Sequence, residues 1–486
     1  MPQLSLNDAP RHKVADATAS RFTRSAVHRD GVVTPTATAR RWLAERRAAN
    51  RFAVRRIALD DLEKWHFDAG TGNIVHDSDR FFTIEGLDVR TDYGPVHAWQ
   101  QPVINQPEIG ILGILVKEFD GVLHCLMQAK MEPGNSNVIQ LSPTVQATRS
   151  NYTQVHRGSV TRYLEYFAQP RRGRVLVDVL QSEQGSWFYR KRNRNMVVEV
   201  DEDVPAHEDF CWLTIGQLRE LLAEDDVLNM DTRAVISCIR FAEPGPEPEP
   251  DADADLGNGE FTGALRRSVG AGAASALDMG SVLSWFTENK TRHQLKTRLT
   301  PLAGVEHWHR SDDAIARDDG RFFRVVAVAV EASNREVTRW TQPLVAPNSE
   351  GIVAFLVRPI KGVLHVLAHA RVEPGYLDTV ELAPTVQSAA ENYRHAPASA
   401  RPPFLDYVLR ADRAAIRYDA YQSEEGGRFY HARNRYMIIE ADDDIAAEVP
   451  PDYLWLTLRQ LGSLLAHPHY LNIEARSLVA CLHSLW

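Results

Sequence analysis

One long segment occurs twice in this chain, and the duplication limits the fold more than any other feature. The first copy runs from Trp99 to Tyr152, and the second begins 241 residues later and runs from Trp340 to Tyr393. The same spacing relates Gly110 to Gly351, Gly121 to Gly362, Glu132-Pro-Gly134 to Glu373-Pro-Gly375, and Pro143-Thr-Val-Gln146 to Pro384-Thr-Val-Gln387. A spacing kept through several motifs indicates a tandem duplication, so two similarly folded repeats are expected.

Composition limits the class of protein. The 486 residues are 44% hydrophobic and 24% charged, which is enough apolar material for two or three domains. The net charge of −9 disfavours nucleic acid as a partner, because a phosphate backbone requires a basic surface. The four cysteines show no paired spacing and are interpreted as core residues of a reducing compartment rather than redox groups or zinc ligands. No stretch approaches the roughly 20 apolar residues that cross a bilayer, so we expect a cytoplasmic protein that does not bind membranes.

The chain is predicted to have four parts. Residues 1–36 are polar without a sustained period and are expected to form a flexible N-terminal arm. The first repeat covers residues 37–242 and begins with apolar residues at helical intervals, namely Ala39, Trp42, Leu43, Ala48 and Phe52. Residues 243–276 begin with an acidic, proline-rich run and predict a solvated linker, since nothing would make their carboxylates converge on a metal. The second repeat covers residues 277–486.

Each repeat shows a pattern rich in strands. The first is predicted to contain a hairpin of 110–117 and 121–130, a strand over 138–141, a short helix over 144–152, a hairpin of 175–180 and 188–200, and a last helix beginning near Trp212. Thr214 is the predicted N-cap of that helix, and Trp455 to Leu461 repeats its pattern. Antiparallel strands with a few segregated helices predict an α+β domain.

This order of elements resembles a Nudix domain in architecture. A Nudix box requires a helix with a cluster of Arg and Glu residues that holds a divalent metal. The segments after Gln146 and Gln387 contain no such cluster. The expected fold is therefore a tandem duplication of a Nudix-like domain that lacks the metal box, and no metal site is expected.

The strand predicted over 121–130 separates polar from apolar side chains. Its polar face ends in Gln128 and Lys130, and the second copy ends in His369 and Arg371. One interpretation is a half-exposed strand. The other is a pocket for an anionic ligand, which is favoured because a cation ends the strand in both copies.

Several amide, phenol and indole groups recur in both copies. Asn151-Tyr152 and Asn392-Tyr393 either end a helix and fill the core, or line a pocket together with Gln146 and Gln387. Amides and phenols suit sugar hydroxyls and the edge of a pyrimidine. The indoles of Trp65 and Trp308 are either core residues or stack on a nucleobase.

The second predicted hairpin is unusually polar. It carries Gln181-Ser-Glu183 and Arg192-Asn-Arg194, which recur as Gln422-Ser-Glu424 and Arg433-Asn-Arg435. These groups exceed what a pair of strands needs to fold, so either a site or a ladder of structural salt bridges is predicted. No phosphate loop, Ser/His/Asp order, Cys/His metal spacing or dinucleotide fingerprint is present.

The doubled motif set resembles the NDP-hexose 2,3-dehydratases of deoxysugar biosynthesis. The resemblance covers about Trp42 to Trp486 without the linker and is carried by Glu132-Pro-Gly134, Leu141-Ser-Pro-Thr-Val-Gln146, Asn151-Tyr152, Gln181-Ser-Glu183 and Arg192-Asn-Arg194, each present in two copies. It implies an enzyme without a cofactor, usually a homodimer, that converts dTDP-4-keto-6-deoxy-D-glucose into dTDP-3,4-diketo-2,6-dideoxy-D-glucose. The product feeds 2,6-dideoxysugars of antibiotic glycosides, and its instability implies a 3-ketoreductase as the next enzyme.

The chemistry expected of such an enzyme indicates roles for individual residues. We expect Glu183 to be the base at C3, Tyr152 the acid or enolate donor, and Lys130 the charge stabiliser. The first repeat is favoured for the chemistry because a lysine can give or take a proton, whereas Arg371 only binds. The expected substrate-binding residues are Trp65, Gln146, Arg149, Ser150, Asn151, Tyr152, Ser182, Arg192, Trp308, Arg371, Gln387, Ser388, Asn392, Tyr393, Glu424, Glu425 and Gly426.

Two other classes of protein fit the sequence. A nucleotide-sugar-binding or Nudix-derived hydrolytic protein fits the fold but leaves the missing metal cluster unexplained. The other is a purely structural protein that forms dimers, in which the predicted pocket of each repeat would have no function.

Overall fold

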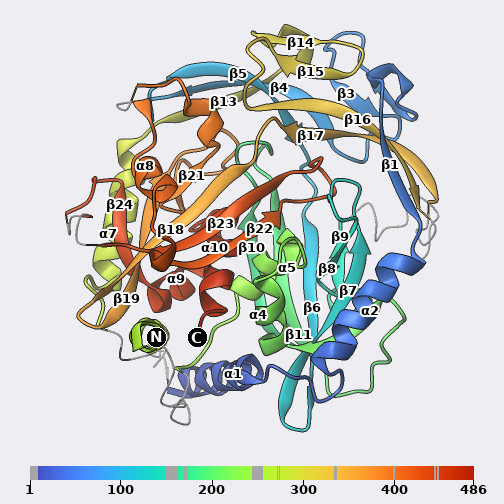
Figure 1. The fold of residues 1–486 in the computed structure, drawn as a ribbon. Coiled ribbons are helices and arrows are strands. Elements are labelled where there is room, and N and C mark those ends of the chain that lie inside the picture. The colour runs from blue at the N-terminus through green and yellow to red at the C-terminus, as the bar shows by residue number, and fades with distance from the viewer. Residues whose placement is uncertain are drawn as a thin grey trace, which may run out of the picture.

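The computed structural model describes residues 9–148, 161–168, 172–243, 256–270, 272, 274–332, 337–397, 400–442, 445 and 448–486. The strands of this part of the chain form two seven-stranded and two five-stranded sheets. In Figure 1 the two large sheets lie beside each other, and the two small sheets lie together at the top. The mixed helix-and-sheet architecture with two repeated halves confirms the predicted duplication.

Each large sheet is built by one repeat. The first has the order β10-β11-β6-β7-β12, with β8 on β7 and β9 on β6, and only the pairing of β11 with β6 is parallel. Its strands are β6 Gly110–Phe119, β7 Val122–Met131, β8 Ile139–Ser142, β9 Val145–Ala147, β10 Arg174–Ser182, β11 Arg192–Glu199 and β12 Phe210–Thr214. The second repeats this arrangement with β18 Gly351–Ile360, β19 Val363–Arg371, β20 Glu381–Ala383, β21 Val386–Ser388, β22 Ile416–Ser423, β23 Arg433–Glu440 and β24 Tyr453–Thr457. Both predicted hairpins are therefore confirmed.

The small sheets show that the repeats exchange strands. The first sheet contains β2 Trp65–Phe67, β3 Ile74–His76, β4 Thr83–Thr91, β5 Ala98–Asn105 and, from the second repeat, β13 Leu295–Thr300. The other contains β14 Trp308–Arg310, β15 Ala314–Arg317, β16 Phe323–Ala332, β17 Arg339–Pro347 and, from the first repeat, β1 Phe52–Ile57. Strand β13 pairs antiparallel with β4, and β1 pairs antiparallel with β16. Each small sheet is thus completed by a strand of the other repeat.

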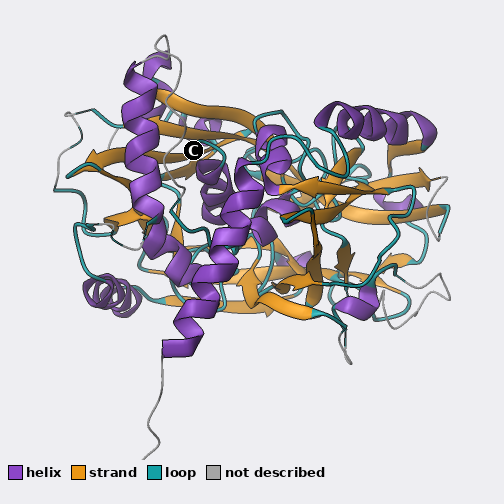
Figure 2. Ribbon diagram, turned by 90° about the horizontal axis from the view of Figure 1, so that it is seen from below, coloured by secondary structure: helices purple, strands orange, loops and turns teal. Residues whose placement is uncertain are grey.

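Most of the helices lie toward the other end of the molecule, which faces the viewer in Figure 2, whereas α7 and α8 lie along the left side of Figure 1. The first repeat has α1 Ala9–Val27, α2 Thr36–Ala49, α4 Ile215–Leu222 and α5 Met230–Ser237; the second has α6 Leu256–Val269, α7 Met279–Arg292, α8 Leu405–Leu409, α9 Leu458–Leu465 and α10 Ile473–His483. Thr214 caps α4 as predicted, because its side chain accepts from the backbone of Gln217 while the Gln217 side chain accepts from Thr214. None of the helices described is long and apolar enough to cross a membrane.

The predicted flexible arm and the predicted linker are wrong over much of their length. Helix α1 lies within the arm over 1–36, and α6 lies within the linker over 243–276. The Ser25 hydroxyl donates to the carbonyl of Leu123 at 2.6 Å, and the Ser268 hydroxyl donates to that of Leu364 at 2.6 Å. Each helix is therefore an integral part of its repeat, fixed by contacts that only the fold creates. Residues 1–8 and 244–255 lie outside the described part of the chain.

The short helix predicted over 144–152 is also wrong where the structure describes it. Residues 145–147 form β9 instead, because their backbone pairs with β6 and this long-range pairing overrides the local pattern. In the second copy, β21 is followed by a 3₁₀ turn over Ala390–Tyr393. Phe52 begins β1 instead of extending the first predicted helix.

The two Glu-Pro-Gly turns hold the repeats together through their backbones. The amide of Gly134 donates to the carbonyl of Gly426 at 2.7 Å, and the amide of Gly375 donates to that of Gly185 at 2.7 Å. A Cβ atom on Gly134 would lie 1.6 Å from the carbonyl oxygen of Phe429. That oxygen belongs to the backbone of the other repeat and cannot yield as a flexible side chain would. Glycine is therefore required here because two backbones meet, which explains why the motif is present twice.

We expect Gly134→Ala to lower the free energy of unfolding by about 1–3 kcal/mol, since overpacking against fixed backbone forces the repeats apart. Urea denaturation followed by circular dichroism measures the loss. Gly462→Ala is the control, because no neighbouring atom lies within 4 Å of its added Cβ and alanine suits a helix better by about 1 kcal/mol. A Gly134→Ala protein as stable as the wild type would contradict this account of the interface.

Candidate functional site

Two polar clusters lie where the Glu-Pro-Gly turn of one repeat meets the polar hairpin of the other. The first polar cluster consists of Lys130, Glu132, Gln146, Asn229 and Asp231 of the first repeat and Glu425 of the second. The amide of Gln146 donates to Glu132 Oε1 at 2.7 Å and accepts from Asn229 Nδ2 at 3.1 Å. Lys130 Nζ lies 3.8 Å from the same carboxylate oxygen. The cluster therefore joins a cation, amides and carboxyl groups at one place.

The second polar cluster consists of Arg371, Glu373, Gln387, Asn472 and Glu474 of the second repeat and Ser186 of the first. Glu373 Oε1 accepts from Arg371 Nε at 3.0 Å, from Gln387 Nε2 at 3.1 Å and from Ser186 Oγ at 3.0 Å. Asn472 Nδ2 donates to Gln387 Oε1 at 2.8 Å, as Asn229 does to Gln146. The two clusters thus share one framework of glutamate, glutamine and asparagine.

The carboxyl groups of the clusters are hard to ionise. Burial raises the pKa of Asp231 well above its usual range, and the charges of Glu183 and Glu425 act in the same direction. Burial likewise raises the pKa of Glu425 to about 7, although the nearby Arg428 opposes it. In the second cluster, burial and the charge of Glu373 raise the pKa of Glu474 well above its usual range. Carboxyl groups that are protonated near neutral pH can donate protons in a reaction.

The first repeat also contributes a side chain next to the second cluster. Tyr93, which follows β4 of the first repeat, has its hydroxyl 2.9 Å from Nε2 of His369. Asp452 Oδ2 lies 3.1 Å from the same nitrogen, and the ring of Tyr453 stacks on the imidazole with centroids 4.2 Å apart. Burial lowers the pKa of His369, so the ring is neutral at neutral pH. Sequence reasoning missed Tyr93, because nothing in the chain places the first repeat beside His369.

The strand that carries these cations is covered on both faces. His124 and Leu126 lie on the face predicted to be polar, and both are fully buried. Leu123 and Cys125 on the opposite face are buried as well. A half-exposed strand is therefore wrong, and only its end at Gln128 and Lys130 is partly accessible.

Glu183 lies deeper than expected. Its side chain is 3% exposed, and its Oε1 accepts from Asn193 Nδ2 across the hairpin at 2.7 Å. Burial raises its pKa, while Arg476 and Lys191 oppose that shift. The charge of Glu183 reaches both Asp231 and Glu425, so this carboxyl group borders the first polar cluster. The salt-bridge alternative for this hairpin applies instead to Arg194, whose guanidinium pairs with Asp178 at 2.5 Å.

The Gln-Ser pairs of the polar hairpins bind the other repeat. Ser182 Oγ donates to Glu381 Oε2 at 2.6 Å, and Ser423 Oγ donates to Gln140 Oε1 at 2.7 Å. Gln181 Nε2 donates to the carbonyl of Leu465 at 3.1 Å. Ser182 was expected to bind substrate, but the structure places it in the buried interface between repeats. Gln181, Ser182 and Ser423 therefore serve assembly of the fold.

Trp65 and Trp308 are core residues, which was the alternative to stacking on a nucleobase. Both are 7% exposed. The indole of Trp65 packs on Phe82, and that of Trp308 packs on Phe323 with the same 4.7 Å between ring centroids. Trp308 Nε1 also donates to the carbonyl of Gln100 at 3.1 Å, across the repeats. The Trp-His sequence alone did not show whether the tryptophan lies in the hydrophobic core or at the edge of a binding pocket.

The remaining expected binding residues fall into four groups. Gln146 and Glu425 lie in the first cluster, and Arg371 and Gln387 lie in the second. Glu424 is buried beside Asn434 and Tyr436, from which its Oε1 accepts at 2.6 and 2.9 Å. The others lie at the ends of β11 and β21, in the 3₁₀ turn or at the inter-repeat turn, namely Arg192, Ser388, Asn392, Tyr393 and Gly426. Arg149, Ser150, Asn151 and Tyr152 lie outside the described residues.

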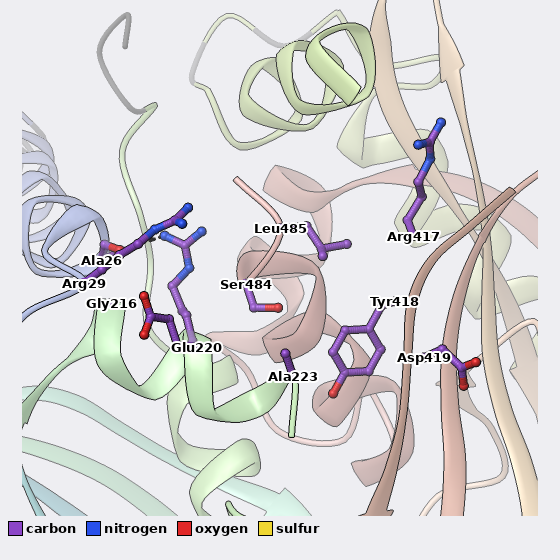
Figure 3. Close-up of a pocket in the computed structure, with 11 residues that line it drawn as sticks. Ala26, Arg29, Gly216, Glu220, Ala223, Arg417, Tyr418, Asp419, Ser484 and Leu485 are labelled. Carbon is purple, nitrogen blue, oxygen red and sulfur yellow. Dashed lines mark hydrogen bonds between the residues drawn. The ribbon is translucent and has the colours of Figure 1, made fainter. Parts of the chain in front are cut away.

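A separate cavity of about 250 Å³ shares no residue with either cluster. It lies among α1, α4, β22 and the last residues of the chain, as Figure 3 shows, with the ring of Tyr418 directed toward α4. Two of its charged groups are already engaged, since Arg219 donates to the carbonyl of Ala26 at 2.8 Å and Asp419 pairs with Arg435 at 2.6 Å. The two polar clusters are therefore the better candidates for chemistry.

Comparison with known proteins identifies the family. The family model described as NDP-hexose 2,3-dehydratase matches residues 36–239 and 279–482, once in each repeat. A dTDP-4-dehydro-6-deoxy-alpha-D-glucopyranose 2,3-dehydratase of Saccharopolyspora spinosa is 57% identical over 96% of this chain and 95% of that protein. Proteins with the same name from Amycolatopsis orientalis and Streptomyces violaceoruber are 54% and 47% identical, over 96% and 93% of this chain and 94% and 98% of their own lengths. With a matching family model in both repeats and relatives that align almost from end to end, this chain belongs to the NDP-hexose 2,3-dehydratase family.

Proposed function

We propose that this enzyme removes water across C2–C3 of dTDP-4-keto-6-deoxy-D-glucose and forms dTDP-3,4-diketo-2,6-dideoxy-D-glucose. The observation that carries the proposal is the substrate named for three relatives, which are 47–57% identical over nearly the whole chain. The polar clusters offer the cations, amides and carboxyl groups that such a sugar requires. The product would supply 2,6-dideoxysugars of antibiotic glycosides.

The reaction needs a base, a stabilised enolate and an acid. The 4-keto group acidifies the hydrogen on C3, so one positioned carboxylate can remove it. Donors near O4 then stabilise the enolate, and an acid assists the departing 2-hydroxyl. We assign the base to Glu183, a donor to Tyr152 and charge stabilisation to Lys130, which places the chemistry at the first polar cluster. Lys130 beside Glu132, and the electrostatic reach of Glu183 into the cluster, support this assignment.

The second polar cluster would bind the same sugar nucleotide without transforming it. Its cation is Arg371, which stays charged and only binds. The shared framework of Glu373, Gln387 and Asn472 supports binding of a similar ligand.

The family resemblance supports three further proposals. Each repeat would be a Nudix-like domain whose metal box is lost, which agrees with the strand order shared by the two large sheets. The enzyme would act as a cytoplasmic homodimer. A 3-ketoreductase would consume the product, because a 3,4-diketo sugar readily loses its nucleotide by further elimination.

With dTDP-4-keto-6-deoxyglucose as the only addition, the purified protein should consume substrate and release nucleotide from the unstable product. An NADPH-dependent 3-ketoreductase should convert that product into an intact 2-deoxysugar nucleotide, which mass spectrometry detects. EDTA should leave the rate unchanged. Loss of turnover in EDTA, or cleavage of the diphosphate, would favour a Nudix-derived hydrolase instead.

Glu183→Gln should slow exchange of the C3 hydrogen for deuterium by roughly 10²–10⁴, the usual contribution of one positioned base. The amide keeps the shape of the side chain and can still accept from Asn193, so the fold should persist in circular dichroism. Proton NMR in D₂O measures the exchange. Glu424→Gln is the matched variant in the second repeat and should slow exchange less than about tenfold. A folded Glu183→Gln enzyme with near wild-type exchange would move the search for the base to Lys130 and His124.

A further inference from the structure

Two carboxyl groups from different repeats lie near each other at the turn that follows Glu425. Position 427 is a glycine, and a Cβ placed there would lie 2.6 Å from Glu425 Oε1 and 3.8 Å from Glu132 Oε1. The two carboxyl oxygens therefore lie close to the same point. A side chain at position 427 would collide with the Glu425 carboxyl group, so glycine allows this group to lie near Glu132.

The second polar cluster differs at the corresponding place. Ser186 takes the position of Gly427, and its hydroxyl donates to Glu373 Oε1 at 3.0 Å. Gln184, an amide that cannot release a proton, takes the position of Glu425. The first cluster therefore has a carboxyl group where the second has an amide, and it lacks the serine hydroxyl that binds the glutamate.

Several buried polar atoms of the first polar cluster and its turns have no hydrogen-bond partner among the residues described. Glu425 Oε2, Asp231 Oδ1 and both polar atoms of the Asn135 side chain are buried, and no hydrogen-bond partner is found for them in the described part of the chain. Asp231 is 3% exposed and Asn135 is 4% exposed. Buried polar atoms normally have partners, so a polar ligand that supplies them is expected here.

We propose that Glu425 of the second repeat is the general acid that protonates the departing 2-hydroxyl, which sits between Glu425 and Glu132. This inference rests on the proposed function and adds a catalytic residue to it. The reaction site is completed only by both repeats, which explains why the first repeat needs the second.

The proton and electron balance of the step is simple. The base removes the C3 proton, and the electron pair of that bond forms the enolate at C4. When the enolate collapses, the C2–C3 double bond forms and the C2–O bond breaks. Glu425 gives its proton to the leaving oxygen, so water departs and Glu425 becomes a carboxylate. The enol at C3 then takes a proton at C2 and becomes the ketone, with no change in oxidation state overall.

Burial supports this role, because a general acid must hold its proton at the working pH. The buried position of Glu425 and the charges of Glu132 and Glu183 raise its pKa to about 7. Arg428 and Lys130 oppose this shift and will stabilise the carboxylate that remains after proton transfer.

The test compares two leaving groups in the full-length enzyme. Glu425→Gln should slow elimination of water from dTDP-4-keto-6-deoxyglucose by about 10²–10⁴. The same variant should release fluoride from the 2-deoxy-2-fluoro analogue within about threefold of the wild-type rate, because fluoride departs without a proton. Glu425→Asp keeps an acid and should recover part of the loss. Glu288→Gln, an exposed carboxylate on α7, is the control and should eliminate both groups at wild-type rates.

The pH profile gives a second readout. Because the protonated form of Glu425 is required, the wild-type rate of water elimination should fall as the pH rises above about 7, and fluoride release should not show this fall. A folded Glu425→Gln enzyme that eliminates water within about threefold of the wild type would overturn the assignment. Equal loss of water and fluoride elimination would also overturn it, since that points to binding or to the base. A wild-type enzyme that eliminates neither group would refute the proposed function itself.

Discussion

Two buried arginines hold the molecule together where the repeats meet. Arg233 donates to the carbonyl of Ser423 in the second repeat at 2.6 Å, and Arg476 donates to that of Ser182 in the first at 2.6 Å. Both side chains are fully buried, and each also binds a carbonyl of its own repeat. A buried guanidinium stays charged and must keep its acceptors, so each polar hairpin is fixed by the opposite repeat. The turns that carry Glu183 and Glu425 follow directly from these hairpins.

This reciprocal arrangement makes both clusters composite. Each Glu-Pro-Gly turn meets the hairpin of the other repeat, so every cluster receives side chains from two distant parts of the chain. Duplication supplies the same backbone framework twice, and a few substitutions then separate the chemistry of the two places. The first cluster has lysine, glutamate and glycine where the second has arginine, glutamine and serine. These differences change side-chain volume little, but they change which groups can release a proton and whether a serine hydroxyl is present.

Much of the fold followed from local pattern. The hairpins of the large sheets and the capping of α4 by Thr214 were predicted because strand alternation and capping residues act over a few positions. Helix α1 was missed because it is held by contacts such as that of Ser25 with Leu123, which are distant in sequence. Strand β9 was missed for the same reason, since its pairing with β6 decides its conformation. Of the candidate site, Lys130 and Gln146 were found because a cation and a glutamine recur at these positions in both copies. Glu425 was expected only as a substrate-binding residue, and Asp231 and Tyr93 carried no local signal.

The sequence by itself determined that the chain has two equivalent halves, which polar motifs they share, and which family carries those motifs. These facts depend only on residue identity and spacing, which can be read from the amino-acid sequence. Only the tertiary structure decided that β1 and β13 are exchanged, that Ser182 faces the other repeat, and that Glu425 lies beside Glu132. Contacts between residues some 200 to 300 positions apart follow from packing of the whole core. A fixed offset between copies shows that two halves correspond, but it does not show which half supplies the neighbour of a given side chain.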